Sequence, residues 1–240
     1  MKRRRFPALV QGTQFRRFAG ISLALMLLFT RGDTRADDDH ASVRWDIIRV
    51  VFNEGGPGVI GLHPGGEAWA STLSGQGNAG NPPGTATTEK IKLTGSGTFR
   101  PPKRNKVGYH VTGGGTWQTF RTINDVRVMA LGGYRVTAIV SWEIANFQTP
   151  GFIDHIGNAD ERANGTAVLK IRFSDGEEGT LVLGCHGPGA PGRIFEGITV
   201  TKGFETYWYP ESPGADPNKN RTLFHVSADH DDDGDDDDGK

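Results

Sequence analysis

Two nearly identical glycine-rich segments constrain the fold of this chain more than any other feature of its sequence. They are Leu93-Thr-Gly-Ser-Gly-Thr-Phe99 and Val111-Thr-Gly-Gly-Gly-Thr-Trp117, which lie 18 residues apart. This separation is shorter than the unit of a solenoid, and it suits two antiparallel strands joined by a loop over residues 100–106. The repeated segment therefore predicts a β-hairpin.

The glycines of this hairpin fall on one face. Alternate residues of a strand point the same way, so each copy places two glycines between an aliphatic and an aromatic residue. The residues on this face are Leu93, Gly95, Gly97 and Phe99 in the first copy and Val111, Gly113, Gly115 and Trp117 in the second. Because glycine weakens a strand, this trough predicts a sharp bend in a curved sheet or the close approach of a neighbour or a ligand.

Further strands are predicted along most of the chain from β-rich or alternating segments, at residues 43–52, 67–73, 126–129, 133–144, 167–173, 178–183, 193–201, 204–209 and 222–226. The segment from Asn53 to Thr87 is otherwise predicted to be loop, because it is rich in Gly and Pro. No long helical pattern accompanies these strands. The expected fold is all-β, a single-domain antiparallel barrel over residues 43–228, with a β-sandwich as the alternative. The glycine trough favours the barrel, because closing a sheet requires bends.

The first 36 residues have the pattern of an export signal. Lys2–Arg5 and Arg16-Arg17 precede an apolar run from Phe18 to Phe29. A helix of that length covers about 18 Å, which is short of the roughly 30 Å hydrocarbon core of a membrane. We therefore expect a cleaved signal peptide over residues 1–36, a periplasmic or secreted protein, and no membrane span after cleavage.

The charge of the chain is concentrated at its ends. Removing residues 1–36 removes eight Lys/Arg and one Asp, which changes the formal charge from −1 to −8. Residues 229–240 contain eight Asp and one Lys and carry most of that charge. We expect this acidic tail to be disordered, with a short acidic segment over residues 37–42 at the other end. The rest is close to neutral, so no nucleic-acid partner is expected.

The pair Cys185-His186 is the one place where a nucleophile and a base are neighbours in the sequence. Cys185 is also the only cysteine, so the chain cannot form an internal disulfide. Adjacent residues of a strand face opposite ways, so the thiol and the imidazole are not expected to hydrogen-bond to each other. The alternative to a reactive Cys185 is a buried cysteine beside a histidine at the rim.

Carboxylates supply the other catalytic candidates. Glu143, Glu196 and Asp154-His155 are candidates for acid/base chemistry inside a barrel, and His110 is a further one. A glycosidase needs two carboxyl groups held about 5 to 9 Å apart, and sequence alone gives no such distance. The alternative is that Glu143 and Glu196 lie on the outer faces of their strands.

Ligand and metal candidates lie near the C-terminus. Tyr207, Trp208 and Tyr209 cannot all face inward, so they predict an exposed patch for stacking on a ligand. Asp229, Asp231 and Asp233 followed by Gly234 resemble the start of an EF-type calcium loop. Lys240 occupies the position where that loop requires Glu, so we expect only weak Ca²⁺ binding and no other cofactor.

Several segments resemble a group of bacterial exported proteins that carries no assigned activity. The resemblance rests on the two glycine-rich copies, on Phe173-Ser-Asp-Gly-Glu177 and on Phe195-Glu-Gly-Ile-Thr199. It implies export and one domain, and no site residues. The sequence favours a non-enzymatic binding or structural module at or beyond the cell envelope, with a small molecule, a glycan or an envelope component as its partner. The alternative is an enzyme with its active site inside the barrel.

Overall fold

The computed structural model describes residues 41–72, 88–103, 106–122, 126–211 and 219–228. Its strands are β1 (Ala41–Phe52), β2 (Ile60–Pro64), β3 (Ala68–Ser71), β4 (Thr88–Leu93), β5 (Ser96–Phe99), β6 (Gly114–Thr122), β7 (Val126–Phe147), β8 (Ile153–Asp154), β9 (Arg162–Phe173), β10 (Glu178–Cys185), β11 (Gly197–Lys202), β12 (Glu205–Tyr207), β13 (Tyr209–Pro210) and β14 (Thr222–Ala228). A 3₁₀ helix, η1 (Ala159–Glu161), precedes β9. The all-β prediction is confirmed.

The predicted signal peptide and the acidic tail lie outside the described residues, as does most of the acidic segment 37–42. Strand β1 begins at Ala41, two residues before the predicted start of the β domain. Within the described ranges no helix has both the length and the apolar composition that crossing a membrane requires.

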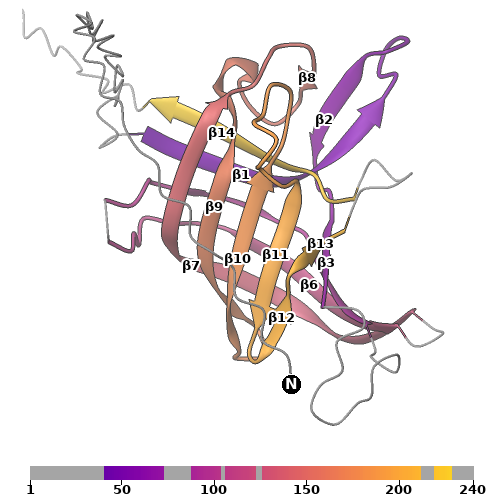
Figure 1. The fold of residues 1–240 in the computed structure, drawn as a ribbon, viewed down its shortest axis with the longest axis vertical. Coiled ribbons are helices and arrows are strands. Elements are labelled where there is room, and N and C mark those ends of the chain that lie inside the picture. The colour runs from indigo at the N-terminus through magenta and orange to yellow at the C-terminus, as the bar shows by residue number, and fades with distance from the viewer. Residues whose placement is uncertain (1–40, 73–87, 104–105, 123–125, 212–218, 229–240) are drawn as a thin grey trace, which may run out of the picture. The chain divides into compact units, whose positions relative to one another are not determined.

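Six antiparallel strands close a barrel. The circuit runs from β1 to β5, β6, β7, β9 and β14 and returns to β1. A continuous circuit of pairings distinguishes a barrel from a sandwich, so the barrel prediction is confirmed. Outer strands extend this circuit: β10, β11 and β12 continue from β9, while β4, β3 and β13 continue from β6 (Figure 1).

The two glycine-rich copies pair as predicted. Leu93 lies opposite Trp117, Ser96 opposite Gly114, and Phe99 opposite Val111, which is one antiparallel register from end to end. The threonines of the two copies meet on the other face, where the hydroxyl oxygens of Thr94 and Thr116 lie 2.7 Å apart and those of Thr98 and Thr112 lie 2.8 Å apart. The first copy is divided between β4 and β5, and β5 also pairs with β1.

Neighbouring backbone and side-chain atoms approach the glycine trough closely. A Cβ atom at Gly97 would lie 2.9 Å from the indole nitrogen of Trp45, and the hydroxyl of Tyr134 donates a hydrogen bond to the carbonyl of Thr94 at 2.9 Å. The close approach of a neighbour, one of the predicted causes, is therefore observed. The glycines allow large aromatic side chains to pack directly against the backbone of the hairpin.

Strand β1 changes partners midway, and this change positions the candidate site. Residues 41–47 pair with β14, whereas Ile48–Phe52 pair with β2. The β1–β2 hairpin projects from the barrel beside the loop that carries β8 (Figure 1). The prediction that the residues of β2 form a loop is wrong. The alternating Ile60 and Leu62 form a short strand because the turn at residues 53–59 folds them back onto β1.

The core is built from alternating strand residues and is dominated by aromatic rings. Its largest fully buried apolar side chains are Trp45, Phe99, Trp117, Phe173 and Phe224. Trp117 and Phe173 pack edge to face with centroids 5.6 Å apart. These rings fill the space between the strands, so we place the candidate site outside the core.

Candidate functional site

A cavity of about 290 Å³ lies where the β1–β2 hairpin leaves the barrel. Most of its wall is apolar, because alternate residues of β1 and β2 point into it. The apolar lining residues are Ile48, Val50, Phe52, Ile60, Leu62, Phe152, Pro188 and Leu223. One side is polar and is formed by Gln148, Cys185, His186, Glu196, Arg221 and Thr222. The cavity thus has an apolar wall and one polar end.

Glu196 occupies the polar end and is held by backbone groups. One carboxylate oxygen accepts a hydrogen bond from the backbone N–H of Thr222 at 2.8 Å, and the other accepts from that of His186 at 2.5 Å. These bonds connect the residue before β11 with the residue after β10 and with the first residue of β14. Glu196 therefore does not lie on an outer strand face, as the alternative interpretation of the sequence held.

The surroundings of Glu196 raise the pKa of its carboxyl group into the neutral range. Burial raises the pKa of Glu196 to about 7, although the two backbone hydrogen bonds, Arg221 and His186 act in the opposite direction. Near neutral pH the carboxyl group is therefore present in both forms, and it can donate a proton or accept one at the polar end of the cavity.

Cys185 is a wall residue with little nucleophilic character. Its side chain is 1% exposed, and its sulfur accepts a hydrogen bond from the amide of Gln148 at 3.3 Å. Burial raises the thiol pKa well above its ordinary value, and the charge of Glu196 adds to this effect. His186 is exposed and directs Nδ1 to the carbonyl of Ile194 at 2.7 Å. This arrangement is a buried cysteine beside a rim histidine.

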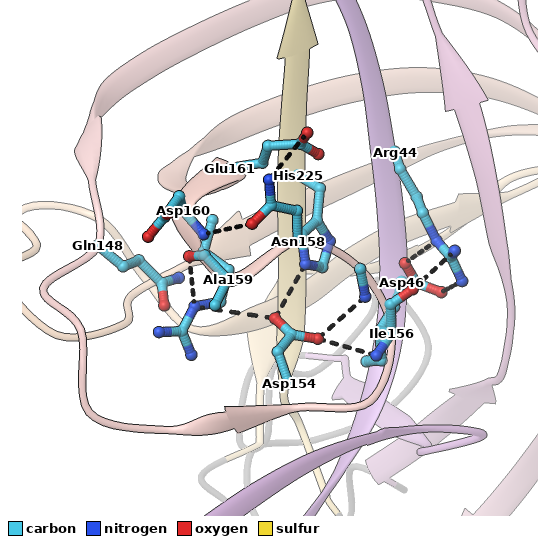
Figure 2. A network of polar contacts seen from close by, with 12 residues as sticks. Arg44, Asp46, Gln148, Asp154, Ile156, Asn158, Ala159, Asp160, Glu161 and His225 are labelled. Atoms are coloured by element: carbon cyan, nitrogen blue, oxygen red, sulfur yellow. Dashed lines mark hydrogen bonds and ion pairs between the residues drawn. The ribbon is translucent and has the colours of Figure 1, made fainter.

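The loop between β7 and β9 forms part of the cavity wall through Gln148 and Phe152, and a buried polar network holds the loop on the barrel. Asp154 is at the centre of this network in Figure 2. One of its oxygens accepts from the backbone N–H groups of Ile156 and Gly157, at 2.8 and 3.1 Å. The other accepts from Nε2 of His225 in β14 at 2.9 Å and lies 3.8 Å from Nε of Arg162.

The charged groups of this network are buried and paired with one another. The side chains of Asp154 and Arg162 are each 1% exposed. Burial alone would raise the pKa of Asp154, but the hydrogen bonds from Ile156, Gly157 and His225 outweigh it and lower that pKa. Arg44 pairs with Asp46 at 2.7 Å and donates to the carbonyl of Ile156 at 3.0 Å, which connects the same loop to β1 (Figure 2).

The Asp154–His225 pair consists of the residue types of a catalytic dyad, but its position indicates a structural role. His225 is 3% exposed, and its Nδ1 atom has no hydrogen-bond partner within the described part of the chain. A dyad needs a nucleophile or a substrate within reach of that nitrogen. We therefore assign this pair to the fixing of the loop and not to acid/base chemistry.

A second polar cluster lies on the face of the β1–β2 hairpin that points away from the cavity. Glu54 comes from the hairpin turn, His63 from β2 and His155 from the residue after β8. The Nε2 atoms of His63 and His155 lie 2.8 and 2.6 Å from the two oxygens of Glu54. The two imidazole rings stack with centroids 4.3 Å apart. Among the described residues, this cluster has the composition and spacing of a metal site.

The structure brings two of the four predicted catalytic residues together. Glu196 and Cys185 both line the cavity. Glu143 and His110 are exposed and do not line it. His155, which was predicted with Asp154 as a candidate for acid/base chemistry, belongs to the cluster with Glu54.

The predicted aromatic patch is only partly exposed. Tyr207 is 2% exposed and belongs to the core, whereas Trp208 and Tyr209 are 61% and 48% exposed. Trp208 borders a second pocket of about 250 Å³, a groove over β10, β11 and β12 that is also lined by Thr180, Val182, Thr199, Val200, Thr201 and Thr206. The predicted calcium ligands Asp229, Asp231 and Asp233 lie outside the described residues.

Sequence reasoning missed the pairing of Glu54 with His63, and it missed Gln148 as a cavity residue. Glu54 and His63 are separated by a turn that was predicted to continue as loop. The alternation of Ile60 and Leu62 after Gly58 was the available signal for a returning strand. Residue 155 is far from both in the sequence and carries no comparable signal.

No protein-family model matches the chain, and no curated protein and no solved structure matches it significantly.

Proposed function

We propose that this protein is an exported, non-enzymatic binding module whose cavity takes a small, mainly apolar molecule with one polar group. The observation that carries this proposal is the division of the cavity into an apolar wall and a single carboxyl group, Glu196, whose pKa is about 7. Ligand sites of this kind obtain affinity from apolar contact and orientation from a few polar groups. The volume of about 290 Å³ corresponds to a fragment-sized ligand.

The chemistry of the site favours binding over catalysis. Glu196 is the only carboxylate among the residues that line the cavity, whereas glycoside hydrolysis requires two. The thiol of Cys185 is held in its protonated form by burial, so it is a poor nucleophile. The rival function is an enzyme that uses Glu196 alone as a general acid or base.

The ligand proposal is tested by calorimetry with octanol, octylamine and octanoate. Ile60→Trp fills the cavity from its partly exposed rim, and it is expected to weaken binding about tenfold or more, since it removes the space for the chain. Octanoate is expected to bind more weakly as the pH rises above 7, because the ionised Glu196 repels it. Trp208→Ala, outside the cavity, serves as the matched control and is expected to leave binding unchanged.

Other results would support the competing functions. Binding that survives Ile60→Trp but is lost in Trp208→Ala would move the site to the threonine-lined groove, where an exposed indole and hydroxyl groups suit a glycan. Hydrolysis of an octanoate ester that disappears in Glu196→Gln would favour the enzyme.

Export is part of the proposal and rests on the charge and apolarity of residues 1–36. It is tested by cell fractionation and N-terminal sequencing. The expected product begins near Asp37 and lies outside the cytoplasm. Material in the cytoplasm that retains Met1 would contradict it.

A further inference from the structure

We propose that Glu54, His63 and His155 form a binding site for one divalent transition-metal ion, with Zn²⁺ as the best fit. The site is separate from the cavity, and it stands whether or not the cavity binds a ligand. It connects two segments that are independent in the sequence: the β1–β2 hairpin and the loop that carries β8.

The geometry of the three side chains supports a shared ion. Both imidazole Nε2 atoms face the same carboxylate, one at each oxygen, and the three ligand atoms all lie within 4.8 Å of one another. Ligand atoms around a tetrahedral Zn²⁺ ion are separated by about 3.3 Å, given metal–ligand distances of roughly 2.0 to 2.1 Å. Small side-chain rotations are therefore sufficient to bring all three atoms to one ion.

The backbone fixes these side chains before any ion binds. The turn is closed by a hydrogen bond from the N–H of Glu54 to the carbonyl of Val59 at 3.1 Å. The N–H of His155 donates to the carbonyl of Leu62 at 3.0 Å, which sets His155 beside His63. Pre-positioned ligands lose little conformational entropy when they bind a metal, and this increases affinity.

The donor set selects the kind of ion. Two imidazole nitrogens and one carboxylate suit Zn²⁺ and its neighbours, whereas Ca²⁺ and Mg²⁺ prefer ligands that are all oxygen. The side chains of Glu54, His63 and His155 are 24%, 21% and 42% exposed, so an ion can reach them from solution. Three protein ligands leave a further coordination position for water or another group.

Metal binding has a structural consequence for the cavity wall. The backbones of the hairpin and the β8 loop pair in parallel, Gly61 with Ile153 and Leu62 with Asp154. Phe152, just before β8, and Leu62, in β2, both line the cavity on the other side. An ion held by His63 and His155 adds metal coordination to the contacts that already join the two walls.

The test is Zn²⁺ titration of the mature chain by competition with a chromophoric chelator, combined with ¹H–¹⁵N NMR of the histidine rings. We expect one ion per chain and shifts at two of the seven histidines. His63→Ala and His155→Ala are each expected to weaken binding about tenfold or more, since each removes a ligand. At a free Zn²⁺ concentration of about 100 times the Kd, the Tm should rise by about 5 °C.

Two controls separate this site from other histidines and from the acidic tail. His110→Ala removes an exposed histidine elsewhere and should leave affinity unchanged. A full-length variant with the eight tail Asp replaced by Asn should retain the high-affinity ion. The proposal is overturned if no stoichiometric Zn²⁺ binding is found, if binding survives the double change of His63 and His155, or if it is lost with the tail charges alone.

Discussion

The core of the barrel and the cavity beside it are made from the same kind of alternating strand, yet one is filled and the other is open. In the core, Trp45 and Trp117 are at most 2% exposed and pack against neighbouring strands. In the cavity, Ile48, Val50 and Phe52 alternate along the second half of β1, and Phe52, the last residue of the strand, is 54% exposed. The difference arises where β1 exchanges its barrel partners for β2, because packing decreases along the hairpin: Ile48, Val50 and Leu62 stay buried near the barrel, whereas Phe52 at the turn end is exposed. The barrel is therefore the scaffold, and the hairpin creates the site.

The largest test of this comparison is a pair of aromatic truncations. Trp117→Ala should lower the free energy of unfolding by about 3 to 5 kcal/mol, because it opens a void in a packed core. Phe52→Ala at the cavity should cost less than about 1 kcal/mol, since little buried contact is lost. Urea unfolding of both variants measures the difference. Equal losses would show that the cavity wall is packed as tightly as the core.

A second test concerns the backbone of the glycine hairpin. Gly113 has a φ of +97°, and a Cβ there would lie 2.1 Å from the carbonyl oxygen of Ser96. We expect Gly113→Ala to cost about 3 kcal/mol or more, from backbone strain and the clash together. Gly176→Ala is the matched control: its φ is +95°, but no atom lies within 4 Å of the added Cβ. It should cost only about 1 kcal/mol, as thermal unfolding can show.

The third test uses the pH dependence of stability. The pKa of Glu196 is about 7 in the folded chain and 4.5 as a free side chain, so the folded state binds the extra proton between these values. The stabilisation is complete below about pH 4.5 and is lost as the pH rises through 7. We expect a loss of about 2 kcal/mol across this range, discounted because the side chain is only half-buried.

Unfolding curves at pH 5, 6, 7 and 8 check this expectation. The glutamine of Glu196→Gln cannot ionise, so the variant should lose most of the pH dependence of its free energy of unfolding. The contributions of other ionisable groups should remain. A slope that is unchanged in the variant would mean that Glu196 titrates normally and that the polar end of the cavity is well solvated.

The smallest expected effect is at Cys185. Because its thiol is buried and its pKa is raised, N-ethylmaleimide should leave the folded chain unmodified and should label it only after unfolding. Mass spectrometry of the intact chain provides the measurement. Rapid labelling of the folded chain would show that the cavity opens and that the thiol is reactive, which would restore Cys185 as a catalytic candidate.

Local pattern was sufficient to predict the all-β class, the glycine hairpin and the exposure of part of the Tyr207–Tyr209 patch. Each depends on the period of two in a strand, which is visible in neighbouring residues. The strand β2 was missed because it is short and follows a turn rich in Gly and Pro. The pairing of Glu196 with the backbone of Thr222 and His186 had no local signal, since these residues come from three separate strand ends.

The sequence by itself determined most of the strands, the alternation of side chains along them, and the need for glycine where the hairpin is closely approached. Only the tertiary structure decided that the sheet closes with aromatic rings inside, that β1 leaves the barrel at Ile48, and that His155 meets Glu54 and His63. The physical reason is the separation in sequence of the residues that determine each feature. Side-chain alternation is set by the local backbone, whereas a cavity or a metal site depends on which distant strands pair.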